Sequence, residues 1–185
     1  MSDVIFREYW STPIAEYQLD NEDLKTHVVD IINKEYDLGN EVNILVDGDM
    51  FLEWVYSCSK NYLSKFYKND CEVELARSWV NLQKPLENLP IHSHAPIDFV
   101  GVYYINSTDN HPLLNIYDPR PPHKFNEVVV ERNGQNVVDC ARQISIKPKQ
   151  GHLVLFPGYL MHGVDANLTR TSRQSLAMNF KIKNK

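Results

Sequence analysis

From about Glu72 onward the sequence places short runs of β-branched and aromatic residues between turn residues, and no helical pattern separates them. Parallel strands need long crossover connections, which are usually helices, so these runs are expected to pair antiparallel. The predicted fold class is therefore mainly β, an antiparallel sandwich or barrel of about eight strands. The predicted strand runs are VELARSWVNL, FVGVYYI, PLLNIYD, EVVVE, NVVD, ISIKP, HLVLFP and RQSLAMNFKI.

Two connections between these runs have distinctive sequences. Asn133-Gly134 separates EVVVER from QNVVD, and this dipeptide favours a two-residue β-hairpin. Residues 118–126, DPRPPHKFN, hold three of the ten prolines. We expect that segment to form an ordered loop over the sheet, at the mouth of a site.

The first third of the chain has helical periodicity instead. One helix is expected after the acidic stretch 20–23, with an end at Gly39-Asn40, and a second over about 48–67. The second helix has one apolar face, formed by Phe51, Trp54, Val55, Cys58, Tyr62 and Phe66. We expect a single domain with a helical bracing segment over about 1–70 and a β core over about 72–183.

Charge and cysteine content limit the partners and the compartment. The net charge of −5 does not favour nucleic acid, which attracts basic surfaces. Three cysteines, Cys58, Cys71 and Cys140, form no C-x-x-C pair, which fits a reducing cytoplasm. Residues 1–10 lack the apolar core of a signal peptide, and no apolar run approaches the ~20 residues that span a bilayer. The expected location is the cytoplasm.

Two histidines flank a single residue just before the run FVGVYYI. Side chains at positions i and i+2 of a strand point the same way, so His92 and His94 would project together and could chelate one metal ion. His162 follows the apolar run HLVLFP and a Pro-Gly turn, and antiparallel pairing could bring it alongside as a third ligand. The spacing alone leaves open that these are ordinary surface or hydrogen-bonded histidines.

Arg173 opens the last predicted strand, eleven residues after His162. A guanidinium at the start of a core strand is costly unless its charge has a partner, and its planar fork suits a carboxylate. This region therefore offers a metal site and an anion receptor together. The alternative is a salt bridge to one of the 24 acidic residues. Arg170 lies in the turn NLTRTS and is expected to be exposed.

The chain resembles the iron(II)- and 2-oxoglutarate-dependent dioxygenases in a combination of four motifs. These are, in order, HSH, YYIN, LVLFPGYLMHGV and an arginine that opens the strand RQSLAMNF. The chain is similar to oxygenases of bacteria and tailed phages and, more distantly, to prolyl hydroxylases, over about Ser78 to Ile182. The resemblance implies a double-stranded β-helix, or jelly roll, braced by the two helices. It also implies hydroxylation of an unidentified substrate, a protein side chain or a small molecule, with succinate and CO2 as coproducts.

The resemblance further implies the site residues and cofactors. These are His92, His94 and His162 for Fe(II); Arg173, Tyr103, Asn81 and Asn179 for the cosubstrate 2-oxoglutarate; and O2 as oxidant. The usual site has two histidines and a carboxylate, whereas this chain has His94 in the carboxylate's position. Asp98 is the alternative third ligand. It lies four residues past His94 and would share the same strand face if the strand extends back that far. Asp118 could enter from a loop.

Two other functions fit parts of the pattern. A three-histidine site also suits a zinc hydratase or hydrolase with an open position for water, although that leaves Arg173 unexplained. A non-catalytic jelly-roll binding module would need no metal at all. The sequence identifies neither the substrate nor the oligomeric state, for which a homodimer stays open. A phage-encoded protein of this kind would act in the host cytoplasm.

Overall fold

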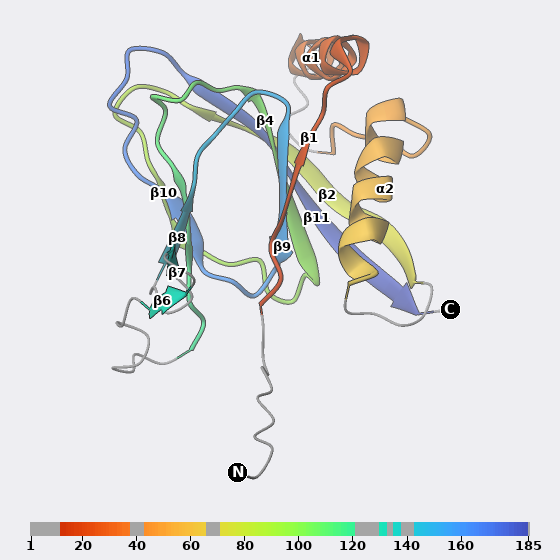
Figure 1. Ribbon diagram of the computed structural model, residues 1–185. Coiled ribbons are helices and arrows are strands. Elements are labelled where there is room, and N and C mark those ends of the chain that lie inside the picture. The colour runs from red at the N-terminus through yellow and green to blue at the C-terminus, as the bar shows by residue number, and fades with distance from the viewer. Residues whose placement is uncertain are drawn as a thin grey trace.

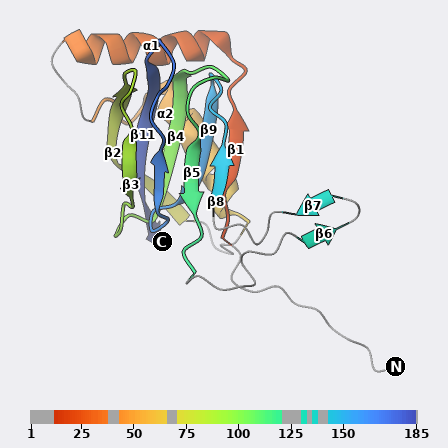
Figure 2. The ribbon, with the colours of Figure 1, turned by 90° about the vertical axis from the view of Figure 1, so that its left-hand side faces the viewer.

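The computed structural model describes residues 12–37, 43–65, 71–120, 130–132, 135–137 and 143–184. Two β-sheets face each other, and two helices cover the outer face of the larger sheet (Figure 1). Figure 2 looks onto the smaller sheet, with the larger one behind it. This arrangement confirms the predicted class, mainly β with helices near the N-terminus.

All neighbouring strands in the two sheets pair antiparallel among the described residues. The larger sheet has the order β1 (Ala15–Gln18), β9 (His152–Pro157), β4 (Phe99–Asn106), β11 (Arg173–Asn184) and β2 (Cys71–Gln83). The smaller sheet has the order β3 (Leu89–His92), β10 (His162–Val164), β5 (Leu114–Tyr117) and β8 (Gln143–Ile146).

The predicted strand runs all overlap observed strands, but the sequence pattern missed three. These are β1, β3 and β10, which contain four, four and three residues. Alternation of polar and apolar residues needs several positions to become visible, so strands this short leave little signal. Two of the missed strands, β3 and β10, carry candidate metal ligands.

The two strands of the hairpin expected at Asn133-Gly134 are present and pair with each other. β6 (Val130–Arg132) pairs antiparallel with β7 (Gln135–Val137), and Arg132 lies opposite Gln135. The two turn residues themselves lie outside the described residues, as do Cys140 and most of the predicted loop 118–126, which is described only to Arg120.

Both predicted helices are present. α1 spans Glu22–Asp37 and α2 spans Met50–Leu63, so α2 is shorter than expected; the predicted stop at Gly39-Asn40 and the stretch 66–67 lie outside the described residues. Asp49 caps α2 by accepting hydrogen bonds from the backbone N–H groups at positions 51 and 52. Its second carboxylate oxygen lies 2.8 Å from Nε2 of His27, which ties α1 to the start of α2. No described helix is long and apolar enough to cross a membrane.

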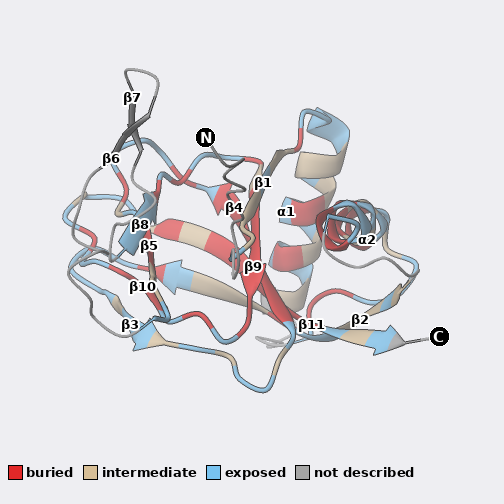
Figure 3. Ribbon diagram, turned by 60° about the horizontal axis from the view of Figure 1, so that its bottom comes forward, coloured by how far each residue is buried: buried red, intermediate tan, exposed pale blue. Residues whose placement is uncertain are grey.

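Strand β4 is buried on both faces. Phe99, Tyr103 and Ile105 pack against the helices, whereas Val102 and Tyr104 pack between the two sheets. Buried residues accordingly run along β4 and β9 at the centre of the larger sheet (Figure 3). The space between the sheets is the interior in which a site can form.

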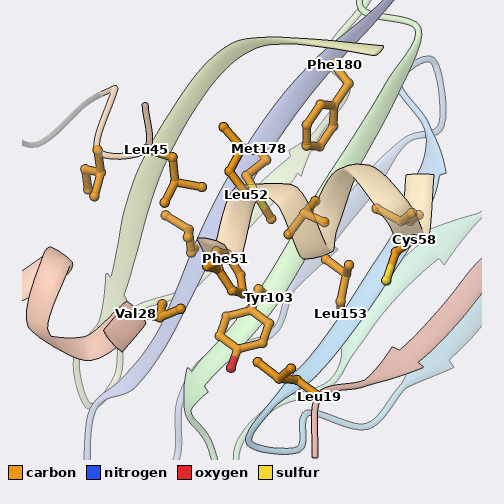
Figure 4. Close-up of a cluster of buried hydrophobic side chains, with 14 of the residues drawn as sticks. Leu19, Val28, Leu45, Phe51, Leu52, Cys58, Tyr103, Leu153, Met178 and Phe180 are labelled. Carbon is orange, nitrogen blue, oxygen red and sulfur yellow. The ribbon is translucent and has the colours of Figure 1, made fainter. Parts of the chain in front are cut away.

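We expect Phe51→Ala to destabilise the protein by about 3–5 kcal/mol, because it leaves a cavity in the core between helices and sheet. Phe51 is fully buried, and its ring centroid lies 4.7 Å from that of Tyr103 (Figure 4). Urea unfolding followed by circular dichroism measures the change. Met50→Ala is the matched control, since Met50 is 64% exposed on the same helix. An equal effect of both substitutions would show that this core does not hold the helix in place.

Candidate metal centre and cosubstrate site

Three histidine side chains converge between the sheets. His162 on β10 lies directly opposite His92 on β3, and their ring centroids are 4.4 Å apart. The ring of His94 lies 5.0 Å from that of His92 and 5.1 Å from that of His162. One ring nitrogen from each residue lies within 4.8 Å of the others, so a single ion could contact all three. The structure thus brings together the three residues that the sequence suggested as ligands.

Hydrogen bonds orient two of these rings for metal binding. Nδ1 of His92 lies 2.7 Å from the carbonyl oxygen of Pro90, and Nδ1 of His162 lies 2.9 Å from that of Leu160. Because a carbonyl can only accept, each Nδ1 carries the proton, and Nε2 is the unprotonated nitrogen available to a metal.

Burial also favours the neutral, metal-binding form of the imidazoles. It lowers the pKa of His94 and that of His162 to about 4, so both rings are neutral near neutral pH. Three imidazole nitrogens suit a divalent transition metal, and the donor set therefore fits Fe(II).

His94 is held differently from the prediction. Strand β3 ends at His92, so His94 lies in the connection that follows rather than on the same strand. Its backbone N–H donates to the carbonyl oxygen of Gly158 at 2.8 Å, while the N–H of Gly158 donates to the carbonyl oxygen of Asp98 at 3.0 Å. The two histidines do point toward a common centre, but the turn at Gly158 positions the second one.

The two aspartates considered as alternative ligands are engaged elsewhere. Strand β4 begins at Phe99, so it does not extend back through Asp98 to His94 as that alternative required. The Asp98 carboxylate accepts a hydrogen bond from the N–H of Ile182 at 2.8 Å and is not part of the histidine cluster. The Asp118 carboxylate accepts hydrogen bonds from Arg120 instead. The structure therefore does not support Asp98 as a ligand and leaves His94 in that place.

We expect Gly158→Ala to weaken metal binding by about 10–100-fold, the range typical of lost outer support around a metal site. A Cβ at this position would clash with the carbonyl oxygen of Ile97, so the backbone that carries His94 must move. Titration with Fe(II) under nitrogen measures the affinity. Ser93→Ala, a change at an exposed residue between the two histidines, should leave the affinity unchanged. Normal affinity in the Gly158 variant would exclude this turn as the support of His94.

Arg173 is a buried cation without a counter-ion. It is 2% exposed, and its guanidinium carbon lies 5.0 Å from the ring centroid of Tyr104. Its Nε is buried without a hydrogen-bond partner, and no carboxylate of the described residues forms a salt bridge with it. An unpaired buried charge is costly, so the site is built to receive an anion.

Asn81 lies beside this cation, as the resemblance implied. Asn81 and Arg173 line one cleft of about 270 Å³ between the end of β2 and the segment leading into β3. The indole N–H of Trp79 donates to Oδ1 of Asn81 at 3.1 Å and leaves the amide N–H groups of Asn81 free to donate to a ligand.

The resemblance placed the wrong tyrosine beside Arg173. Tyr103 lies on the face of β4 that packs against the helices, away from the space between the sheets. Its ring contacts Phe51 there (Figure 4). There, burial raises the pKa of Tyr103 to about 12. Tyr104 is the tyrosine that faces Arg173, and its hydroxyl group is buried without a partner among the described residues. Tyr104 thus replaces Tyr103 as the candidate cosubstrate contact.

The position of Asn179 also corrects its predicted role. It lies six positions beyond Arg173 on β11, which corresponds to roughly 20 Å along an extended strand. A five-carbon dicarboxylate such as 2-oxoglutarate is much shorter than that span. Asn179 therefore cannot contact the carboxylate that Arg173 holds.

Trp79 is a site residue that sequence reasoning missed. Its ring centroid lies 5.6 Å from that of His94, and its indole N–H orients Asn81, so it touches both halves of the site. The signal was present in SWVNL, where Trp79 and Asn81 stand two residues apart and therefore share a strand face.

Comparisons with known proteins agree with this geometry. A family model described as "Putative 2OG-Fe(II) oxygenase" matches residues 77–179, more than half of the chain. Comparison with curated protein sequences gives no match.

Solved structures with the same fold are distant in sequence. A Pseudomonas putida prolyl-4-hydroxylase has a TM-score of 0.61 and 14% identity, with 94% of this chain and 90% of that chain covered. The non-heme alpha ketoglutarate dependent carbocyclase SnoK from nogalamycin biosynthesis has a TM-score of 0.64 and 8% identity, with 93% and 80% covered. A Burkholderia pseudomallei oxidoreductase of the 2OG-Fe(II) oxygenase family has a TM-score of 0.52 and 12% identity, with 74% and 60% covered.

These likenesses confirm the double-stranded β-helix, and the residues that the family model matches include all three histidines and Arg173. Fe(II), 2-oxoglutarate and O2 are the cofactor and the cosubstrates of such enzymes. The chain belongs to the 2OG-Fe(II) oxygenase family.

Proposed function

We propose that this oxygenase hydroxylates a protein side chain or a small molecule, with His92, His94 and His162 holding Fe(II) and Arg173 binding 2-oxoglutarate. One observation supports the proposal above all. A buried guanidinium without a counter-ion lies on the same sheet face as Trp79, whose ring contacts one of three imidazoles that converge on one point. Nucleic acid and membranes are not among the partners we propose.

The chemistry divides between the cofactor and the chain. When bound, iron, 2-oxoglutarate and O2 would supply the oxidation, in which one oxygen atom goes to the substrate and one to succinate, with CO2 released. The chain orients the reactants. Arg173 pairs with the distal carboxylate of the cosubstrate, and the Tyr104 hydroxyl lies beside that guanidinium as a further donor.

Exclusion of water is the second task of the chain. A cluster of buried apolar side chains between the sheets keeps this interior dry; it includes Val100, Val102, Val154, Phe156 and Leu160. The ring of Phe156 lies 4.9 Å from that of His162. Low local polarity strengthens the pairing of Arg173 with an anion and protects a reactive centre from side reactions.

Anaerobic titration with Fe(II) and 2-oxoglutarate tests the proposal. We expect a weak visible charge-transfer band that forms only when both are present, followed by release of succinate when O2 is admitted. Tight zinc binding without that band would instead favour the hydratase or hydrolase. The absence of any metal binding would favour a non-catalytic binding module.

A further inference from the structure

The inner faces of β2 and β11 carry two arginine–asparagine pairs, one on each side of Trp79. Arg173 and Asn81 lie toward one end of the paired strands and form the proposed cosubstrate receptor. Arg77 and Asn179 lie toward the other end, directly opposite each other in the register. Cross-strand partners have Cβ atoms about 5 Å apart, so these two side chains can contact the same ligand group.

Arg77 is an exposed residue whose guanidinium lies over the ring of Trp79. Its central carbon is 5.5 Å from the ring centroid, a cation–π contact that keeps the group on this side of the sheet. Within the described part of the chain, no carboxylate forms a salt bridge with Arg77. The contact with the ring uses no N–H group, so these donors stay available to an anion.

The amide of Asn179 adds a second unmet polar group. Asn179 is 8% exposed, and its Oδ1 is buried without a hydrogen-bond partner. No hydrogen bond between described residues uses its Nδ2 either, which leaves the amide N–H groups as donors next to Arg77. A buried amide oxygen that accepts no hydrogen bond is rare in a folded protein and points to a missing N–H or O–H donor.

This second receptor lies beside the metal centre but apart from the cosubstrate. The Trp79 ring that supports Arg77 is itself 5.6 Å from the ring of His94. The six positions between Asn179 and Arg173 correspond to roughly 20 Å along β11, which exceeds the length of 2-oxoglutarate. The molecule that Arg77 and Asn179 receive is therefore a different one.

We propose that Arg77 and Asn179 bind a carboxylate of the substrate and so place a neighbouring C–H bond beside the metal. The carboxylate oxygens accept from the Arg77 guanidinium and from the Nδ2 group of Asn179, and Oδ1 of Asn179 is left to accept an N–H or O–H group of the same molecule. The inference rests on the proposed function, because it takes the histidine cluster to be the reaction centre. It assigns a substrate class, a carboxylate-bearing molecule.

Propionate and its uncharged analogue propionamide are the probes. The protein is loaded with zinc, which is diamagnetic, and saturated with 2-oxoglutarate, so that the inner receptor is filled. The readout is the indole N–H signal of Trp79 in ¹H–¹⁵N spectra, identified among the three tryptophans with Trp79→Phe. We expect propionate to shift this signal and propionamide to leave it unchanged. Arg77→Gln should weaken propionate binding about tenfold or more.

Controls separate this inference from the proposed function. Arg77→Gln should leave the Fe(II) and 2-oxoglutarate titration unchanged, and Arg170→Gln, at an exposed arginine, should leave both titrations unchanged. Three results would exclude the carboxylate receptor: propionate leaves the Trp79 signal unchanged, both probes shift it equally, or Arg77→Gln binds propionate as tightly as the wild type. Tighter binding of methyl phosphate than of propionate would also exclude it, because the site would then prefer a phosphate group. Failure to form the Fe(II)–2-oxoglutarate band would sink the proposed function instead. If that band does not form, propionate binding to the zinc-loaded protein without 2-oxoglutarate still tests the carboxylate receptor.

Discussion

The His162→Ala variant should lose Fe(II) binding. The drop in affinity should exceed the about 10–100-fold that is typical when a residue supporting a metal ligand, rather than the ligand itself, is lost. His162 is the most buried of the three histidines, and its Nδ1 hydrogen bond to Leu160 directs Nε2 toward the other two rings. Removing it leaves His92 and His94 as ligands. Anaerobic titration with Fe(II), with detection by competition against a chelator, measures the loss.

Two further variants make the result interpretable. His162→Gln keeps the volume and the polarity of the buried side chain, so loss of iron without loss of cooperative unfolding separates ligation from folding. Asp98→Ala removes the carboxylate once considered as a ligand, and it should retain iron because Asp98 bonds the N–H of Ile182. If Asp98→Ala loses the metal while His94→Ala retains it, the assignment of the third ligand is wrong.

The long strands and the order of the ligands were predictable because their signals are local. β2, β4, β9 and β11 each extend over six residues or more, enough for strand-like composition to stand out. β3 and β10 were not predictable, although His92 and His162 lie on them. Their short length hides them, and only the pairing of His92 with His162 reveals their role.

The choice between Tyr103 and Tyr104 shows where local reasoning stops. Alternation establishes that the two side chains lie on opposite faces of β4, but it cannot say which face contains the site. In a sheet with one exposed face, polar residues would mark the outside. Here the helices bury one face and the smaller sheet buries the other, so both tyrosines stand in a continuous apolar run. Only the packing of the helices resolves the ambiguity.

Asp98 and Asn179 failed as predictions for a different reason. Asp98 was selected by its separation from His94 along the chain, whereas the resemblance implied Asn179 as a wall residue of the cosubstrate pocket. Both predictions depended on where a strand begins or how far it extends. β4 starts one residue after Asp98, and β11 carries Asn179 far past Arg173. Strand ends are set by tertiary contacts such as the turn at Gly158, which no sequence window contains.

The second large effect is expected at Arg173. Arg173→Gln should weaken 2-oxoglutarate binding at least about 100-fold while Fe(II) affinity stays within about twofold, because two charge-assisted hydrogen bonds to the distal carboxylate are lost and no metal ligand changes. The Fe(II)–2-oxoglutarate band, titrated with cosubstrate at saturating iron, measures the first quantity. Iron titration without cosubstrate measures the second.

Stability provides an independent readout for the same residue. In the absence of an anion, the buried guanidinium is unpaired, so Arg173→Gln should not destabilise the cosubstrate-free protein as the loss of a salt bridge would. In the wild type, 2-oxoglutarate should raise the unfolding midpoint by binding only the folded state, and the variant should lose that rise. Arg173→Lys keeps the charge but not the planar fork, and it should recover only part of the affinity. Equal cosubstrate affinity in the wild type and Arg173→Gln would mean that the anion receptor lies elsewhere, and the cleft shared with Asn81 would then have no cosubstrate role.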